Sequence, residues 1–242
     1  MNPSMPDISR FRSELARFFS EDGPGSQPTF PDACEGDLCL WTDGSALGDA
    51  RQLGTGGGSA FAVTIVAGGV EHYVASYAER LEPQSESDCG VTVNYAEIKA
   101  IHNGLSYLQK LDGAEDKTIH VFSDSAYAVS VLSKWVHRWE RSERTLESAA
   151  KSGWLCADGW PVANARLIKD THRLRVEFFR VVYHKIAGHS GYFFNEHADH
   201  LASIARNGQL SDALVADYNW RGQRIKSVRF DYTAGKVVLE EY

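Results

Sequence analysis

The stretch Leu38-Cys-Leu-Trp-Thr-Asp-Gly-Ser45 decides the fold, because it has the pattern of a buried strand that ends in a carboxylate. Side chains alternate between the two faces of a strand, so Cys39, Trp41 and Asp43 share one face. A carboxylate in line with bulky apolar residues is costly to bury unless something neutralises it. Two explanations are open: Asp43-Gly44 forms a turn, or Asp43 binds a metal ion. The other acids of the chain decide between them.

The bulk composition is that of an ordinary globular protein. The 242 residues are 43% hydrophobic and 24% charged, which provides enough apolar side chains for a substantial core. No apolar run reaches the roughly 20 residues of a membrane span. Met1–Asp22 lacks a basic region followed by an apolar one, so we expect no secretory signal and no membrane association. The four cysteines lack metal-ligand spacing, which predicts a reducing, cytoplasmic location.

Length and composition predict one domain with an extension at each end. An apolar stripe over residues 6–19 predicts a short amphipathic helix, and a linker rich in Pro, Gly and Ser follows it. Near the other end, the alternating segments Ile225–Phe230 and Lys236–Glu240 predict a hairpin. Either extension is a candidate surface for a protein partner. The expected division is an N-terminal helix and linker, a main domain and a C-terminal extension, at residues 1–36, 37–207 and 208–242.

The main domain predicts an α/β fold with a mixed five-stranded sheet flanked by helices. Gly48–Gly58 is rich in glycine but lacks a phosphate-binding pattern that leads into a helix, so we interpret it as a flexible hairpin loop. An antiparallel meander of three strands is extended by parallel strands through helical crossovers. Beyond the opening strand, we expect strands at Ser59–Ala67, Val70–Ala78, Thr118–Phe122 and Arg175–Lys185, and helices that begin near Asn94, after Asp124 and at Asn195.

Three further acids stand where the predicted helices and strands begin or end. Glu97 heads the buried stripe of the helix that starts near Asn94, Asp124 closes a strand, and Asp199 lies in the first turns of the last helix. Two have ordinary alternatives, because Glu97 is spaced as the capping-box partner of Asn94 and Asp124 is placed as an N-cap. Ligand sites in such sheets lie near the carboxyl ends of strands. If those ends are adjacent, these three acids meet Asp43.

Four carboxylates in one cleft require compensation, because like charges within about 4 to 6 Å raise each other's pKa. Oxygen ligands without cysteine suit Mg²⁺ or Mn²⁺ rather than zinc. Two such ions about 3.5 to 4 Å apart activate a water and stabilise the leaving oxygen in phosphodiester hydrolysis. The acids together therefore predict metal-dependent phosphodiester hydrolysis, and we expect no small-molecule cofactor.

The last predicted helix brings histidines near these acids. His189 lies in a loop flanked by glycines just before the helix, which Asn195 is placed to cap. His197 and His200 lie on the helix itself, and we expect both to be solvated.

The segment Lys134–Arg175 is basic within an acidic chain. A net charge of −7 argues against broad non-specific binding of nucleic acid. This segment, however, holds nine basic and five acidic residues, a local charge of +4, and its tryptophans are interleaved with the basic residues. Such a pattern suits nucleic-acid backbones. The alternative is an ordinary helix with solvated charges and a buried stripe made of Ala128, Val131, Leu132, Trp135 and Trp139.

Over roughly Asp37–Asn207 the chain resembles type I ribonuclease H. The resemblance implies a ribonuclease H-like fold and cleavage of the RNA strand of RNA/DNA hybrids with two metal ions. His189 would assist proton transfer or product departure, and the metal-binding carboxylates would be Asp43, Glu97, Asp124 and Asp199. The motifs that carry it are Thr42-Asp-Gly-Ser45, Tyr95-Ala-Glu-Ile98, Ser123-Asp-Ser125, and Gly188-His-Ser-Gly191 followed by Asn195-Glu-His-Ala-Asp199.

The same resemblance implies residues that bind the substrate. Asn94 would contact the RNA ribose near the scissile phosphate and help to distinguish RNA from DNA through the 2′-OH. Ser45 would contact the substrate, and Lys134–Pro161 resembles the family's substrate-binding handle. The matching handle residues are Lys134, Trp135, Trp139 and Trp154.

Three departures from the family pattern would weaken hybrid binding. The span Trp139–Trp154 is longer than in short bacterial members and carries Glu140, Glu143 and Glu147. Asp49-Ala50 stands where many members have Asn-Pro. Ala187 stands where Lys is frequent. Two alternatives therefore remain open: a nuclease of this fold that acts on another nucleic acid, and a non-catalytic module that binds a hybrid or a protein partner.

Overall fold

The structure is a computed structural model. It describes residues 35–47, 55–67, 70–83, 91–145, 154–189, 192–208, 214–215, 219–220, 223–231 and 236–241. The predicted N-terminal helix and most of the predicted glycine-rich loop lie outside these residues. Within them, no helix combines the length and the apolar composition needed to cross a bilayer.

A mixed sheet organises the molecule, as the sequence predicted. Its five core strands are β1 (Leu38–Ala46), β2 (Gly57–Ala67), β3 (Val70–Leu81), β4 (Thr118–Ser123) and β5 (Arg180–Lys185). Their spatial order is β5-β4-β1-β2-β3. Strands β1, β2 and β3 form the antiparallel meander, whereas β4 pairs parallel with both β1 and β5. The carboxyl ends of β1 and β4 therefore meet at one edge of the sheet, where their acids stand.

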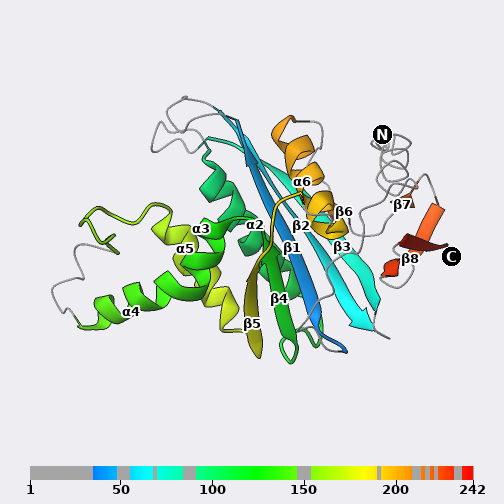
Figure 1. The fold of residues 1–242 in the computed structure, drawn as a ribbon, viewed down its shortest axis with the longest axis horizontal. Coiled ribbons are helices and arrows are strands. Elements are labelled where there is room, and N and C mark those ends of the chain that lie inside the picture. The colour runs from blue at the N-terminus through cyan, green and yellow to red at the C-terminus, as the bar shows by residue number, and fades with distance from the viewer. Residues whose placement is uncertain are drawn as a thin grey trace.

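Helices cover both faces of this sheet (Figure 1). On one face, α2 (Val93–Leu108) buries Ile98, Ile101 and Leu105 against Leu40 and other residues of the main core. On the opposite face, α6 (Phe193–Arg206) packs its alanines and Leu201 on β2 and β3. Strand β1 thus lies between the two helices, and side chains of both helices lie near the carboxyl end of this strand.

The helix after β4 is interrupted, which corrects the predicted tryptophan stripe. α3 (Ala126–Ser130) leads into one π-helical turn, η1 (Val131–Trp135), and then into α4 (Val136–Thr145). A π turn holds an additional residue, so Val136 takes the core position and is fully buried, whereas Trp135 is 44% exposed. Val131 and Leu132, which precede the shift, are buried as predicted.

The basic segment is more regular than its sequence suggested, and its last strand is shorter. Beyond α4, a further helix, α5 (Ala165–Arg175), packs beside α2, and β5 starts only at Arg180. The predicted strand at Arg175–Lys185 was therefore wrong in its first half. The helix ends in a basic last turn, which favours a C-terminus there. The turn that follows buries Phe178 but leaves Phe179 78% exposed.

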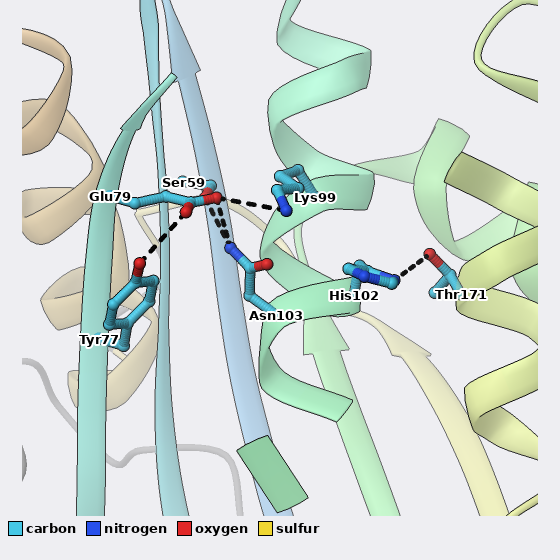
Figure 2. Close-up of polar contacts among 7 residues, drawn as sticks. All are labelled: Ser59, Tyr77, Glu79, Lys99, His102, Asn103 and Thr171. Atoms are coloured by element: carbon cyan, nitrogen blue, oxygen red, sulfur yellow. Dashed lines mark hydrogen bonds and ion pairs between the residues drawn. The ribbon is translucent and has the colours of Figure 1, made fainter. Parts of the chain in front are cut away.

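A polar cluster ties the meander to α2 (Figure 2). Glu79 of β3 accepts hydrogen bonds from Asn103 at 2.6 Å, Tyr77 at 3.2 Å and Ser59 at 3.3 Å. Lys99 adds an ion pair to the same carboxylate at 3.6 Å. Hydrogen bonding satisfies this partly buried charge, so the cluster fixes α2 on the sheet without an orphaned acid.

The C-terminal extension continues the sheet. β8 (Gln223–Asp231) pairs antiparallel with β9 (Lys236–Glu241), which is the pairing predicted for the terminal hairpin. β8 also pairs with the outer side of β3 and with the short β7 (Asn219–Trp220), while β6 (Leu214–Val215) pairs with β3. The extension therefore lies at the end of the sheet away from β5.

Candidate active site

Asp43 lies on the β1 face that the alternation predicted, above an apolar floor. Trp41, two residues earlier on that face, is 1% exposed and stacks on Phe122 with ring centroids 4.4 Å apart. Cys39 is fully buried on the same side, and Phe194 of α6 packs near Trp41. Asp43 itself is only 6% exposed. Its carboxylate is thus held at the boundary between a dry interior and the open strand end.

Gly44 brings Glu97 to the same place. A Cβ atom at Gly44 would lie 2.2 Å from the backbone nitrogen of Glu97, so only glycine permits this approach of α2 to β1. Glu97 is 4% exposed, and Ser123 donates a hydrogen bond to its Oε2 at 3.5 Å. The proposed Asn94–Glu97 capping box is wrong, because α2 starts earlier and Thr92 is its N-cap, accepting from the backbone of Tyr95. Capping therefore does not explain Glu97.

Asp124 follows β4 directly and faces the same strand ends. The alternative that it caps the next helix is also wrong, because Ser125 does so by accepting a hydrogen bond from the backbone of Ala128 at 3.2 Å. A Cβ at Gly188 would lie 2.7 Å from Asp124 Oδ2, so the loop after β5 passes close to this carboxylate. Oxygens of Asp43, Glu97 and Asp124 all lie within 4.8 Å of one another. The predicted convergence of these three acids is therefore observed.

Asp199 and His189 lie beside this triad and bring in Glu196, which sequence reasoning did not assign to the site. His189 Nδ1 is 3.5 Å from Glu196 Oε2 and 4.0 Å from Asp199 Oδ2. Glu196 is three residues before Asp199, so the two share one face of α6. This three-residue spacing in the sequence could have indicated that Glu196 lies at the site. His189 is 79% exposed and has a φ of 50°, a conformation that few non-glycine residues adopt.

Two predictions for α6 need correction. The helix starts at Phe193, so Asn195 lies inside it as a buried residue rather than as its cap. Within the part of the chain that the structure describes, Asn195 Oδ1 has no hydrogen-bond partner. His197 is 5% exposed rather than solvated, with Nε2 3.2 Å from Ser76 Oγ of β3. The apolar surface of the meander explains the difference, because α6 lies flat on it and buries the side that holds His197.

The protein alone does not balance the negative charge of the carboxylates at this site. Burial first, and the charges of Asp124 and Asp199 next, raise the pKa of Asp43 to about 8, although a hydrogen bond from the Gly44 backbone opposes the rise. Burial likewise raises the pKa of Glu97 well above its ordinary value, and the charges of Asp43 and Asp124 add to it. Asp43 and Glu97 are therefore both harder to ionise than ordinary carboxyl groups. A cation among them would remove this penalty.

The donor set fits a hard divalent cation. It consists of the carboxylate oxygens of Asp43, Glu97 and Asp124, and the ordinary ions of such a set would be Mg²⁺ or Mn²⁺. The exposed side of the site is the His189 side, where Glu196 holds the imidazole and, through its hydrogen bond first and its charge second, raises the pKa of His189 above its ordinary value. The arrangement can bind a cation on its buried side and a proton on its exposed side.

The residues expected to bind substrate fall into two groups. Asn94, Lys134 and Trp135 are exposed, and Ser45 is partly exposed with its hydroxyl 2.9 Å from Arg206 Nη1. Trp154, in contrast, is 5% exposed. The Trp154 ring is therefore buried within the protein, and its contact with substrate stays a prediction.

The structural role of Trp154 is clear from its neighbours. Its ring packs on Trp139 with centroids 5.5 Å apart, and Lys169 Nζ lies 4.6 Å from its ring centre. Trp139 is partly buried by this contact. Of the expected handle tryptophans, Trp135 is the most exposed.

Comparison with known proteins agrees with this geometry. The family model of RNase H matches residues 35–207. A ribonuclease H of Anaeromyxobacter dehalogenans is 37% identical over 118 residues, which are 49% of this chain and 56% of that protein, so the chain spans little more than half of that relative. A ribonuclease HI of Haemophilus ducreyi is 29% identical over 177 residues, 72% of this chain and 93% of that protein.

Solved structures share the fold. The crystal structure of LC9-RNase H1, described as a type 1 RNase H with the type 2 active-site motif, has a TM-score of 0.56 at 21% identity and covers 79% of this chain and 82% of its own. A foamy viral protease-reverse transcriptase in complex with an RNA/DNA hybrid has a TM-score of 0.51 at 15% identity, over 86% of this chain and 24% of that one. With a family match over residues 35–207 and the sheet order described above, the chain belongs to the RNase H family.

Proposed function

We propose that this protein is a metal-dependent endoribonuclease that hydrolyses the RNA strand of RNA/DNA hybrids. The observation that carries the proposal is the convergence of Asp43, Glu97 and Asp124 within 4.8 Å, with Asp43 and Glu97 buried at an unfavourable pKa. A structural role would not retain so costly a cluster, because perturbed carboxylates gather at functional sites. Membership of the RNase H family supports the choice of reaction.

Asp43, Glu97, Asp124 and Asp199 would hold two Mg²⁺ ions, with Mn²⁺ as a substitute, and these ions would supply Lewis-acid activation of a phosphodiester and of a water molecule. The protein residues fix this site in advance. Gly44 locks α2 against β1, and the Trp41–Phe122 stack keeps water away from the buried side of Asp43. The carboxylates therefore need little rearrangement to accept cations.

His189 has the position of a proton carrier at the exposed side. Its Nδ1 faces Glu196, which stabilises the protonated imidazole, and its side chain is open to solvent. A protonated His189 can deliver its proton to the departing ribose oxygen or help the product to leave, and Glu196 then favours reprotonation.

Substrate contacts would come from the exposed residues around the cleft. Asn94, in the first turn of α2, would contact the ribose 2′-OH. Ser45, whose hydroxyl is bound by Arg206, would contact a phosphate. Trp135 offers an open ring for stacking, with the exposed Lys134 beside it. Glu140, expected from the sequence to weaken this surface, directs its carboxylate to His172 of α5 at 3.2 Å.

A substrate panel tests the proposal. The full chain is incubated with Mg²⁺ and an RNA/DNA hybrid, duplex RNA or duplex DNA, each labelled on either strand, with Asp124→Asn as control. We expect cleavage of only the RNA strand of the hybrid, abolished by EDTA and by the substitution. Cleavage of a different duplex would assign the fold to another nucleic acid, and binding without cleavage would indicate a non-catalytic module.

Two further expectations stay proposals. The hairpin β8–β9 extends the sheet beyond β3 and offers a surface for a protein partner. A cytoplasmic location rests on the cysteine pattern alone. Cell fractionation with a tagged chain, followed by identification of proteins lost on deletion of 208–242, tests both.

A further inference from the structure

A second group of metal-ligand side chains lies away from the carboxylate site, where α4 meets α5. His137 and Glu140 lie one turn apart on α4, and His172 is on α5. One ligand atom from each lies within 4.8 Å of the other two. His172 Nε2 is 3.2 Å from Glu140 Oε1, and His137 Nδ1 is 4.0 Å from Glu140 Oε2. The two imidazole rings meet edge to face with centroids 5.1 Å apart.

This donor set differs in kind from the first one. Two imidazole nitrogens and one carboxylate oxygen suit zinc and related divalent transition metals, whereas the all-carboxylate set suits magnesium. Tetrahedral zinc with bonds of about 2.0 to 2.2 Å holds its ligand atoms about 3.3 Å apart. The contact between His172 and Glu140, at 3.2 Å, already has that spacing. Only the His137 ring has to move closer, and its side chain is 39% exposed.

The cluster combines a buried ligand with an open side. His172 is 6% exposed, and among the residues that the structure describes its Nδ1, the ring nitrogen that does not face Glu140, has no hydrogen-bond partner. Glu140 lies between this buried imidazole and the partly exposed His137 side chain, so the His137 side leaves an entry path for an ion.

We propose that His137, Glu140 and His172 bind one divalent transition-metal ion that ties α4 to α5. The ion would join helices that are otherwise linked here by a hydrogen bond between Glu140 and His172 and by ring packing. α4 extends from the body of the molecule (Figure 1), and its attachment fixes the direction in which it projects. The proposal concerns metal binding and helix attachment, so it stands whether or not the chain cleaves hybrids.

Zinc binding to the full chain tests the site. The Asp124→Asn protein, freed of metal with EDTA and exchanged into buffer, is titrated with Zn²⁺ by calorimetry, so that the carboxylate site contributes little. We expect one saturable site, whose affinity falls by at least about tenfold in His137→Ala and in Glu140→Gln. Glu177→Gln, which removes an exposed acid from the turn after α5, should leave the affinity unchanged and is the charge-matched control.

Thermal unfolding supplies a second readout. It uses no substitution of the buried His172, which could prevent folding. Zn²⁺ should raise the Tm of the parent protein and of Glu177→Gln, but not of His137→Ala, whose substitution lies on a part-exposed side chain. Absence of saturable Zn²⁺ binding in the parent protein would overturn the proposal. The same conclusion would follow if His137→Ala and Glu140→Gln bound Zn²⁺ as tightly as the parent.

Discussion

Replacing Asp43 with Asn should make the metal-free protein more stable at neutral and alkaline pH. Burial first, then the charges of Asp124 and Asp199, raise the pKa of Asp43 from its ordinary value of 3.8 to about 8. Between these values the folded chain holds a proton that the unfolded chain has released. The free energy of unfolding of the metal-free protein therefore falls as the pH rises through this window.

The pKa of Asp43 sets the size of the effect. Each pKa unit corresponds to about 1.4 kcal/mol, so a rise from 3.8 to about 8 represents on the order of 5 kcal/mol over the whole window. Burial also raises the pKa of Glu97, and the charge of Asp43 adds to it, so the two groups titrate together and part of the penalty remains after one substitution. We expect Asp43→Asn to be more stable than the wild type by about 2 to 4 kcal/mol near pH 8 and to match it near pH 4.

Urea unfolding in EDTA, repeated at several pH values across this window, measures the effect. Asp116→Asn, which neutralises an exposed acid, should follow the wild type. Added Mg²⁺ should restore the stability of the wild type at the alkaline end and do little for Asp43→Asn. If wild type and Asp43→Asn lose stability in parallel as the pH rises, the buried carboxylates do not carry the penalty and the reasoning fails.

Three further predictions follow from individual contacts. Gly44→Ala should lower Mg²⁺ affinity and destabilise the fold by about 1 to 3 kcal/mol, because its Cβ would lie 2.2 Å from the α2 backbone. Calorimetry measures the affinity and urea unfolding the stability. A Mg²⁺ affinity equal to that of the wild type would contradict the close approach of α2 to β1. Glu196→Gln should lower the pKa of His189, since that contact raises it, and an NMR titration that shows no change would exclude the contact. Trp154→Ala should cost about 3 to 5 kcal/mol of stability, whereas Trp135→Ala should weaken hybrid binding and leave stability nearly unchanged; equal losses of stability in urea would refute the assigned burial.

The sequence predicted the sheet and the acid cluster because both depend on short-range periodicity. Alternation along β1 placed Asp43 on the Trp41 face, and four-residue spacing placed Glu97 at the head of a buried helical stripe. Strand ends that carry acids converge once the strand order is known. The succession of strands and helices predicted a meander extended by parallel strands, but the adjacency of β4 and β1 comes from the structure.

Features that depend on exact backbone paths were not predictable in this way. Thr92 rather than Asn94 caps α2, so the helix starts two residues earlier than its polar residues suggested. The π turn at η1 adds a residue, so Val136 rather than Trp135 is buried in the core. The contact of Glu196 with His189 depends on where the loop before α6 places the imidazole. Each is decided by tertiary packing that overrides local preference.

The most direct test of the central claim is Mg²⁺-dependent hydrolysis of an RNA/DNA hybrid by the full chain and by Asp124→Asn, purified identically and shown to be folded by circular dichroism. If the converging carboxylates form the catalytic metal site, the wild type cleaves the RNA strand, EDTA abolishes cleavage, and the substitution lowers the rate by on the order of a thousandfold or more. Cleavage by Asp124→Asn at the wild-type rate, or no cleavage by the folded wild type at any Mg²⁺ or Mn²⁺ concentration, would contradict it.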